Sequence, residues 1–122
     1  MEKTRPREVN PKDTTRAKAY ELWLNAPNPM VTFSKTLDVT SLIKISKKKN
    51  LKFNMLLDYC IAKSASRIKE FYLLPVGEKL IQYESIAINT IVKNKNGEIN
   101  SCDILYDSNL EKFNLDYKKY TA

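Results

Sequence analysis

The sequence predicts an α/β fold in which helices pack against β-strands, and three observations support this prediction. Apolar residues recur at three- and four-residue steps from Phe53 to Phe71, which is the pattern of an amphipathic helix. β-Branched residues dominate Ile86 to Val92, as in a strand, and Asn96-Gly97 follows as a strong hairpin-turn signal. Segments with helical and with alternating patterns succeed one another along the chain, which favours a core shared by both kinds of structure.

The first third of the chain predicts a helix followed by a strand. Asp13 or Thr14 can cap a helix that runs to about Asn25, where a proline-rich segment ends it. Apolar and polar residues then alternate from Met30 to Leu37. This alternation predicts a strand with one polar face.

The middle of the chain predicts two helices. Asp38 or Thr40 can cap a short helix that ends in the run Lys47–Lys49, because positive charge is favourable at a helix C-terminus. The longer helix from Phe53 to Phe71 follows, and Cys60 falls on its apolar stripe. A buried, unreactive thiol is therefore expected at Cys60.

The last part of the chain predicts two hairpins and a final helix. The expected strands are Tyr72–Val76, Lys79–Tyr83, Ile86–Val92 and Glu98–Tyr106. Gly77 and Gly97 suit the two turns, since glycine adopts turn conformations without steric cost. Ser108 and Glu111 have the spacing of a capping box that opens the last helix.

Composition and charge exclude several classes of protein. One tryptophan, seven tyrosines and four phenylalanines are typical of a globular chain and not of a disordered one. No apolar run reaches the length of a membrane span, two cysteines make no disulfide framework, and a zinc site is not expected without histidine. We therefore expect a reduced, cytoplasmic protein with a polar arm over residues 1–12 and a single lobe over residues 13–122.

The net charge of +7 leaves two interpretations open. It suits an anionic partner such as nucleic acid, and it also suits a solvated surface without any partner. The sequence holds no known nucleic-acid motif, and its aromatic residues are mostly expected in the core. A nucleic-acid partner is therefore not favoured.

The order of several short motifs resembles the N-terminal half of chloramphenicol acetyltransferase and its relatives. The matching segments are Arg16 followed by Tyr20 and Trp23, then Leu37-Asp38-Val39-Thr40, Lys48 to Phe53, Glu70-Phe71, and Glu84-Ser85. The resemblance runs from about Thr15 to Tyr120. It covers nearly all of this chain and only about the first half of the family's length.

The resemblance implies an α/β sandwich built on a mixed sheet, assembled as a trimer with active sites between subunits. It also implies transfer of an acetyl group from acetyl-CoA to a hydroxyl of a small-molecule acceptor. Arg16 matches the arginine that forms an orienting ion pair with the aspartate of a His-His-x-x-x-Asp-Gly motif in the family's C-terminal half. The acceptor-binding residues implied are Tyr20, Trp23, Val31, Phe33, Thr90 and Ile99.

Departures from the family pattern predict a pocket of different shape. Val31 and Ile99 stand where relatives have aromatic residues, and Trp23 is bulkier than its counterparts. Tyr72 replaces an arginine that many relatives have at the end of the long helix. A pocket changed at these positions is not expected to match chloramphenicol in shape.

The family's catalytic base is a histidine, and this sequence contains none. General-base catalysis needs a group with a pKa near the working pH, which histidine has without perturbation. We therefore expect this chain to be the acceptor-binding part of an O-acetyltransferase and to be inactive alone. We also expect it to self-associate. An expression fragment, a truncated gene product or a relative without its catalytic half would fit this expectation. The alternatives are a non-catalytic small-molecule-binding or oligomerising module of the same fold, and a basic nucleic-acid-binding domain.

Overall fold

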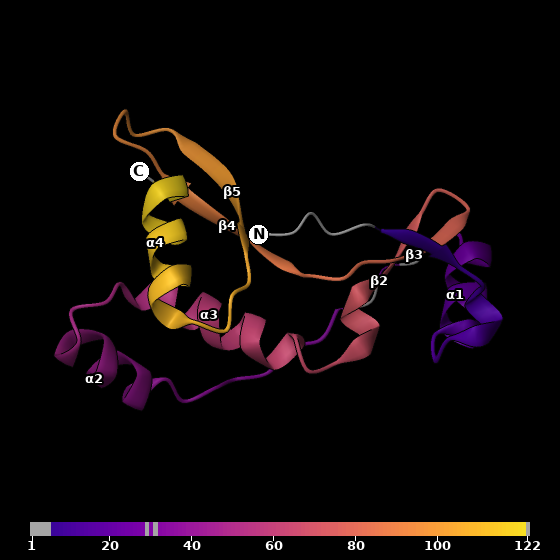
Figure 1. Cartoon of the computed structure of the whole chain (residues 1–122), viewed down its shortest axis with the longest axis horizontal. Coiled ribbons are helices and arrows are strands. Elements are labelled where there is room, and N and C mark those ends of the chain that lie inside the picture. Colours follow the sequence, from indigo (N-terminus) through magenta and orange to yellow (C-terminus); the bar gives the residue numbers. More distant parts are fainter. Residues whose placement is uncertain (1–5, 29, 31, 122) are drawn as a thin grey trace. The chain divides into compact units, whose positions relative to one another are not determined.

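The computed structural model describes residues 6–28, 30 and 32–121, and they form two compact units. The first unit comprises the described residues of Met1–Leu37 together with Ile68–Glu84, and the second those of Asp38–Arg67 together with Ser85–Ala122. Helices and strands occur in both units, so the α/β class expected from the sequence is confirmed (Figure 1). The single lobe over residues 13–122 stays a prediction.

The first unit is built on a small antiparallel sheet with the strand order β1-β3-β2. Its elements are β1 (Arg7–Val9), η1 (Pro11–Asp13), α1 (Ala17–Asn25), η2 (Lys69–Tyr72), β2 (Leu73–Val76) and β3 (Lys79–Gln82). Strand β1 lies within the segment expected as a polar arm and pairs with β3. The hairpin expected around Gly77 is confirmed, and Gly77 has a φ of 61° in the turn.

Tyr20, Leu73 and Leu80 form the core of the first unit, and Val9 packs against them. Leu73 and Leu80 come from the hairpin and Tyr20 from α1, so this core joins the helix to the sheet. Apolar burial of this kind supplies most of the stability of a short helix such as α1.

Helix α1 begins later than the sequence indicated, because the residues before it form the short helix η1. The Asn10 side chain accepts a hydrogen bond from the Lys12 N–H and caps η1. The Thr14 hydroxyl donates to the Pro11 carbonyl and accepts from the Arg16 N–H, which closes η1 and separates it from α1. The prediction that Asp13 or Thr14 caps this helix was therefore wrong, since Arg16 is its N-cap residue, whereas the end at Asn25 is confirmed.

The second unit packs helices against one hairpin. Its elements are α2 (Thr40–Lys48), α3 (Phe53–Ala65), β4 (Ala87–Lys93), β5 (Ile99–Leu105) and α4 (Leu110–Thr121). Strands β4 and β5 pair antiparallel, with Thr90 opposite Cys102, and α4 lies beside this hairpin in Figure 1. The buried core consists of Met55, Leu56, Ile104, Phe113 and Tyr117.

The strand expected from Met30 to Leu37 is not formed by its described residues, 30 and 32–37. A strand is stable when its backbone groups pair with a neighbour, and no neighbouring strand pairs with these residues. Their side chains are exposed, with Phe33 at 91%. The strand predicted from the alternating pattern was therefore wrong for these residues, because no strand in the described part of the chain pairs with them.

Helix α3 ends at Ala65 and does not continue to Phe71. The Ser64 hydroxyl donates to the Cys60 carbonyl and the Ser66 hydroxyl to the Lys63 carbonyl, and such side-chain bonds compete with the helical ladder. Cys60 is exposed, so the expected buried thiol was also wrong. The buried positions of α3 are Met55, Leu56, Asp58 and Ala62, because these face the rest of the unit.

Helix α4 is capped by Asn109 and not by Ser108. The Asn109 carboxamide oxygen accepts from the N–H groups of Glu111 and Lys112, at 2.9 and 3.2 Å. Asp107 in turn accepts from the Asn109 N–H at 2.8 Å. The helix itself is confirmed. The capping box expected from Ser108 and Glu111 was wrong, because the capping residue is Asn109, one position later.

Candidate functional site

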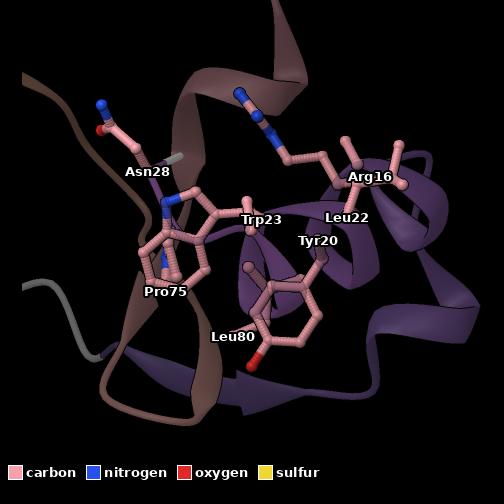
Figure 2. A pocket seen from close by; sticks show the side chains of 9 residues that line it. Arg16, Tyr20, Leu22, Trp23, Asn28, Pro75 and Leu80 are labelled. Carbon is pink, nitrogen blue, oxygen red and sulfur yellow. The ribbon is translucent and has the colours of Figure 1, made fainter. Parts of the chain in front are cut away.

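The candidate site is a cavity of about 570 Å³ in the first unit, beside α1 (Figure 2). Its lining comprises Arg16, Ala19, Tyr20, Leu22, Trp23, Ala26, Asn28, Pro75 and Leu80. Small-molecule sites of proteins fall in the range of about 300–1,000 Å³ and are mostly apolar with a few polar groups. Both the size and the lining of this cavity fit that description.

Helix α1 and the N-cap residue before it place three of the predicted residues on one side. Arg16, Tyr20 and Trp23 are spaced by four and three positions, which brings side chains to the same face. Alanine, leucine, lysine and glutamate supply most of the remaining residues of α1, and all are good helix formers. The helix ends where Ala26 leaves the helical conformation before Pro27.

Tyr20 anchors α1 to the hairpin of β2 and β3. It is 9% exposed, and its hydroxyl donates to the Glu78 carbonyl at 2.6 Å. The Trp23 ring stacks on the Tyr20 ring with centroids 6.5 Å apart and an interplanar angle of 23°. Trp23 remains 38% exposed, so its ring forms a wall of the cavity that a ligand can reach.

Arg16 is half-buried at the N-cap of α1 and lines the same cavity. Its Nε–H donates to the Glu70 carbonyl at 3.0 Å. The Glu70 carboxylate accepts instead from the Thr15 hydroxyl, also at 3.0 Å, and forms no ion pair with Arg16. The ion pair expected for Arg16 thus has no carboxylate among the described residues and stays a prediction.

Of the other predicted acceptor-binding residues, the three that the structure describes do not line this cavity. Phe33 is exposed in the first unit, and Val31 lies outside the described residues. Thr90 and Ile99 belong to the second unit, where Thr90 is buried and Ile99 is 76% exposed. Their part in acceptor binding stays a prediction.

Several lining residues cannot be recognised from the sequence because their role depends on tertiary structure. Leu22 lies off the face of α1 that the pattern marked, and Asn28 belongs to a segment that read only as a helix stop. Pro75 and Leu80 come from the hairpin. In the sequence, Leu80 could be expected to be buried only as an apolar residue next to Lys79 in a predicted strand. Only the pairing of the hairpin beside α1 brings them to the cavity.

A separate polar cluster lies in the second unit and joins α3, β4 and α4. The Asn54 amide nitrogen lies 3.1 Å from the Thr90 hydroxyl, 3.1 Å from the Tyr117 hydroxyl and 3.5 Å from Asp58 Oδ2. Asp58, Thr90 and Tyr117 are all buried. Burial raises the pKa of the Asp58 carboxyl, and a hydrogen bond from Thr90 opposes part of that rise.

The N-cap of α2 is Val39, without a side-chain capping bond, so the cap expected at Asp38 or Thr40 was wrong, but Asp38 still makes hydrogen bonds at the start of the helix. Its Oδ1 accepts from the Thr40 hydroxyl at 2.6 Å and from the Thr40 N–H at 2.9 Å. These two bonds stabilise the charged form and lower the pKa of the Asp38 carboxyl. Asp38 thus holds the first turn of the helix.

The comparisons with known proteins agree with this fold. The family model described as chloramphenicol acetyltransferase matches residues 8–122. The chain belongs to the chloramphenicol acetyltransferase family. A solved structure named chloramphenicol acetyltransferase matches with a TM-score of 0.82 and 14% identity, over 94% of this chain and 55% of that one. No curated protein sequence matches the chain.

The fold of this chain is therefore that of the family. The chain spans about half the length of the solved relative. In the described part of the chain, no helix is long and apolar enough to cross a membrane. The same residues hold no group of three or more acidic or cysteine side chains placed to bind a metal ion.

Proposed function

We propose that this chain is the acceptor-binding part of an acetyltransferase that transfers an acetyl group from acetyl-CoA to a hydroxyl of a small molecule. The observation that carries the proposal is the cavity beside α1, lined by Tyr20, Trp23 and Arg16 in a chain of this family. An apolar acceptor would pack on the Trp23 ring and on Leu22 and Leu80. Arg16 would provide the positive charge at the edge of the site.

The chain alone is proposed to bind the acceptor without transferring the acetyl group. Its 122 residues include no histidine, so a general base of the usual kind has to come from elsewhere. Asp58 is the described carboxyl whose pKa is raised, and it is engaged in the polar cluster of the second unit. The complete enzyme would combine this part with a second half that supplies the base, as an oligomer and by resemblance a trimer.

The same missing base supports one alternative, a non-catalytic binding module that uses the cavity to hold a small molecule. Both candidates require a ligand in the cavity, and they differ in their response to acetyl-CoA. A cytoplasmic location is part of either proposal, and both Cys60 and Cys102 are free thiols. The oligomer is tested by light scattering, where a clean monomer would count against it.

Binding and turnover of the purified chain test the proposal directly. Isothermal titration with a neutral probe, 3-phenylpropane-1,2-diol, should show saturable binding that Trp23→Ala abolishes. Leu24→Ala is the matched control, because Leu24 lies on the same helix but lines a different cavity. If the diol does not bind, or binds equally to Trp23→Ala, the cavity is not the acceptor site.

Turnover is measured by chromatography of free CoA after incubation with acetyl-CoA and the diol. A thiol-reactive dye is unsuitable because the exposed thiol of Cys60 would react as well. No release of CoA above the rate without protein is expected. CoA release by the purified chain would show that it is catalytic on its own, whereas diol binding that acetyl-CoA never alters would favour the binding module.

A further inference from the structure

A buried carboxyl lies where three elements of the second unit meet. Asp58 of α3 is 8% exposed and accepts a hydrogen bond from the hydroxyl of Thr90 on β4. The Asn54 amide nitrogen, one turn earlier on α3, lies 3.1 Å from that hydroxyl and 3.1 Å from the hydroxyl of Tyr117 on α4. Among the described residues, no buried side-chain nitrogen or oxygen lacks a hydrogen-bond partner, so the cluster is complete within this unit.

The cluster offers few hydrogen-bond donors to an ionised Asp58. An amide nitrogen carries two hydrogens, and Asn54 uses them for the hydroxyls of Thr90 and Tyr117. Its distance of 3.5 Å from Asp58 Oδ2 is at the limit of a hydrogen bond, so Thr90 is the close donor to the carboxylate. A buried charge needs several donors to offset its loss of water. Burial accordingly outweighs the Thr90 bond and raises the pKa of the Asp58 carboxyl.

Asp58 is the group of the cluster whose charge changes in mildly acidic solution. The other titratable groups that face it are the phenol of Tyr117 from α4 and the thiol of Cys102 from β5, whose side chain shares the buried face of the hairpin. Phenols and thiols are ordinarily uncharged below about pH 7. The charged side chains of α2, β4, β5 and α4 are exposed, apart from Asp116, which pairs with Lys112. The proton on Asp58 therefore decides whether the cluster is neutral or charged.

We propose that this cluster is a pH-sensitive clamp, which holds α4 on α3 and β4 more tightly when the Asp58 carboxyl is protonated than when it is ionised. Ionisation leaves a charge with one close donor in an apolar core, and opening of the clamp lets water reach that charge. Tyr117 links the cluster to α4, because its hydroxyl accepts from Asn54 while its ring packs in the core with Phe113. Asn54 is exposed, so the cluster borders on solvent and a proton reaches it without unfolding of the whole unit.

Amide hydrogen exchange of the purified chain measures how tightly α4 is held. It is read by NMR from about pH 7 down to about pH 4 and corrected for the intrinsic exchange rate. Protection of the α4 amides should rise on acidification, and α1 in the first unit serves as the internal comparison. The carboxyl carbon of Asp58 gives its titration midpoint in the same sample. If Asp58 titrates at 3.8 in the open clamp, each pH unit below that midpoint, down to 3.8, should raise the protection of α4 about tenfold.

Two variants assign the response to Asp58. Asp58→Asn keeps the shape of the side chain and removes its charge, so α4 should be better protected at neutral pH than in the unmodified chain, with no further rise on acidification. Glu111→Gln makes the same chemical change at an exposed position of α4 and should keep the response. Circular dichroism shows whether each variant has folded, and if Asp58→Asn has not, the midpoint of Asp58 in the unmodified chain decides.

Three results would overturn the clamp. The first is a midpoint of Asp58 at or below 3.8, and the second is protection of α4 that does not change with pH. The third is a response that persists in Asp58→Asn or is lost in Glu111→Gln, because the titrating group would then lie elsewhere. The inference stands apart from the proposed function, since the cluster belongs to the second unit and the acceptor cavity to the first.

Discussion

Phe113 offers the sharpest test of how the second unit is held together. Its side chain is fully buried in α4, within the core that includes Met55, Leu56 and Ile104. The Tyr59 ring meets the Phe113 ring edge-on, with centroids 5.6 Å apart. Phe113→Ala would therefore remove a large apolar contact and leave a cavity in a packed core.

The magnitude follows from burial and from the aromatic pair. Removing a fully buried phenylalanine costs about 3–5 kcal/mol, and the lost contact with Tyr59 places this site in the upper part of that range. Such a loss approaches the whole stability of a small unit, which is about 5–15 kcal/mol. We expect Phe113→Ala to lower the free energy of unfolding of the second unit by about 4 kcal/mol.

Urea denaturation followed by circular dichroism measures this loss, and helix α4 supplies its own control. Leu115 lies two residues away and is 64% exposed, so Leu115→Ala should change the free energy of unfolding by less than about 0.5 kcal/mol. Phe113→Leu keeps most of the side-chain volume and should fall between the two. A loss below about 1 kcal/mol for Phe113→Ala, or one equal to that of Leu115→Ala, would refute the reasoning.

Three further predictions concern the polar cluster and the turns. Asn54→Ala should lower the free energy of unfolding by about 1–3 kcal/mol, because the buried hydroxyls of Thr90 and Tyr117 lose their donor, whereas Asn100→Ala at an exposed position should have little effect in the same urea assay. Burial holds the pKa of Asp58 above its unfolded value of 3.8, so the folded state binds its proton first as the pH falls. The free energy of unfolding should therefore rise relative to that of Asp58→Asn from neutral pH down to about 3.8, as followed by thermal melts, and a constant difference would contradict this. Gly97→Ala should cost about 1–2 kcal/mol in thermal unfolding because φ is +82°, while its added Cβ would make only ordinary contact with Lys93 at 3.6 Å; no loss would mean that the turn adapts.

Local signals predicted those elements whose partners lie nearby in the sequence. The β4–β5 hairpin was found because β-branched residues and Asn96-Gly97 specify both strands and their turn, and the paired strands differ from the prediction by a residue or so at each end. The end of α1 was found because Pro27 cannot continue a helix. Each of these outcomes depends on residues close to one another in the chain.

The predictions that were wrong concern features set by tertiary contacts, which a local sequence pattern does not reveal. The segment from Met30 to Leu37 alternates like a strand, but a strand forms only where a second strand accepts its hydrogen bonds. Along α3 the apolar stripe included Cys60, whereas the buried face is set by the elements that pack on the helix and includes Asp58. Arg16, Tyr20 and Trp23 were found through a family resemblance, and Leu80 and Pro75 joined them only through the fold.

The positions of Trp23 and Cys60 give the chain a built-in distance gauge. Trp23 lies in the first unit as the sole indole fluorophore, and Cys60 lies in the second unit as an exposed thiol on α3. Cys102 is less exposed, and its thiol donates to the Tyr120 carbonyl, so an acceptor dye can be attached selectively at Cys60. In the ligand-free chain, energy transfer from Trp23 to that dye then reports the separation of the two units without any engineered residue.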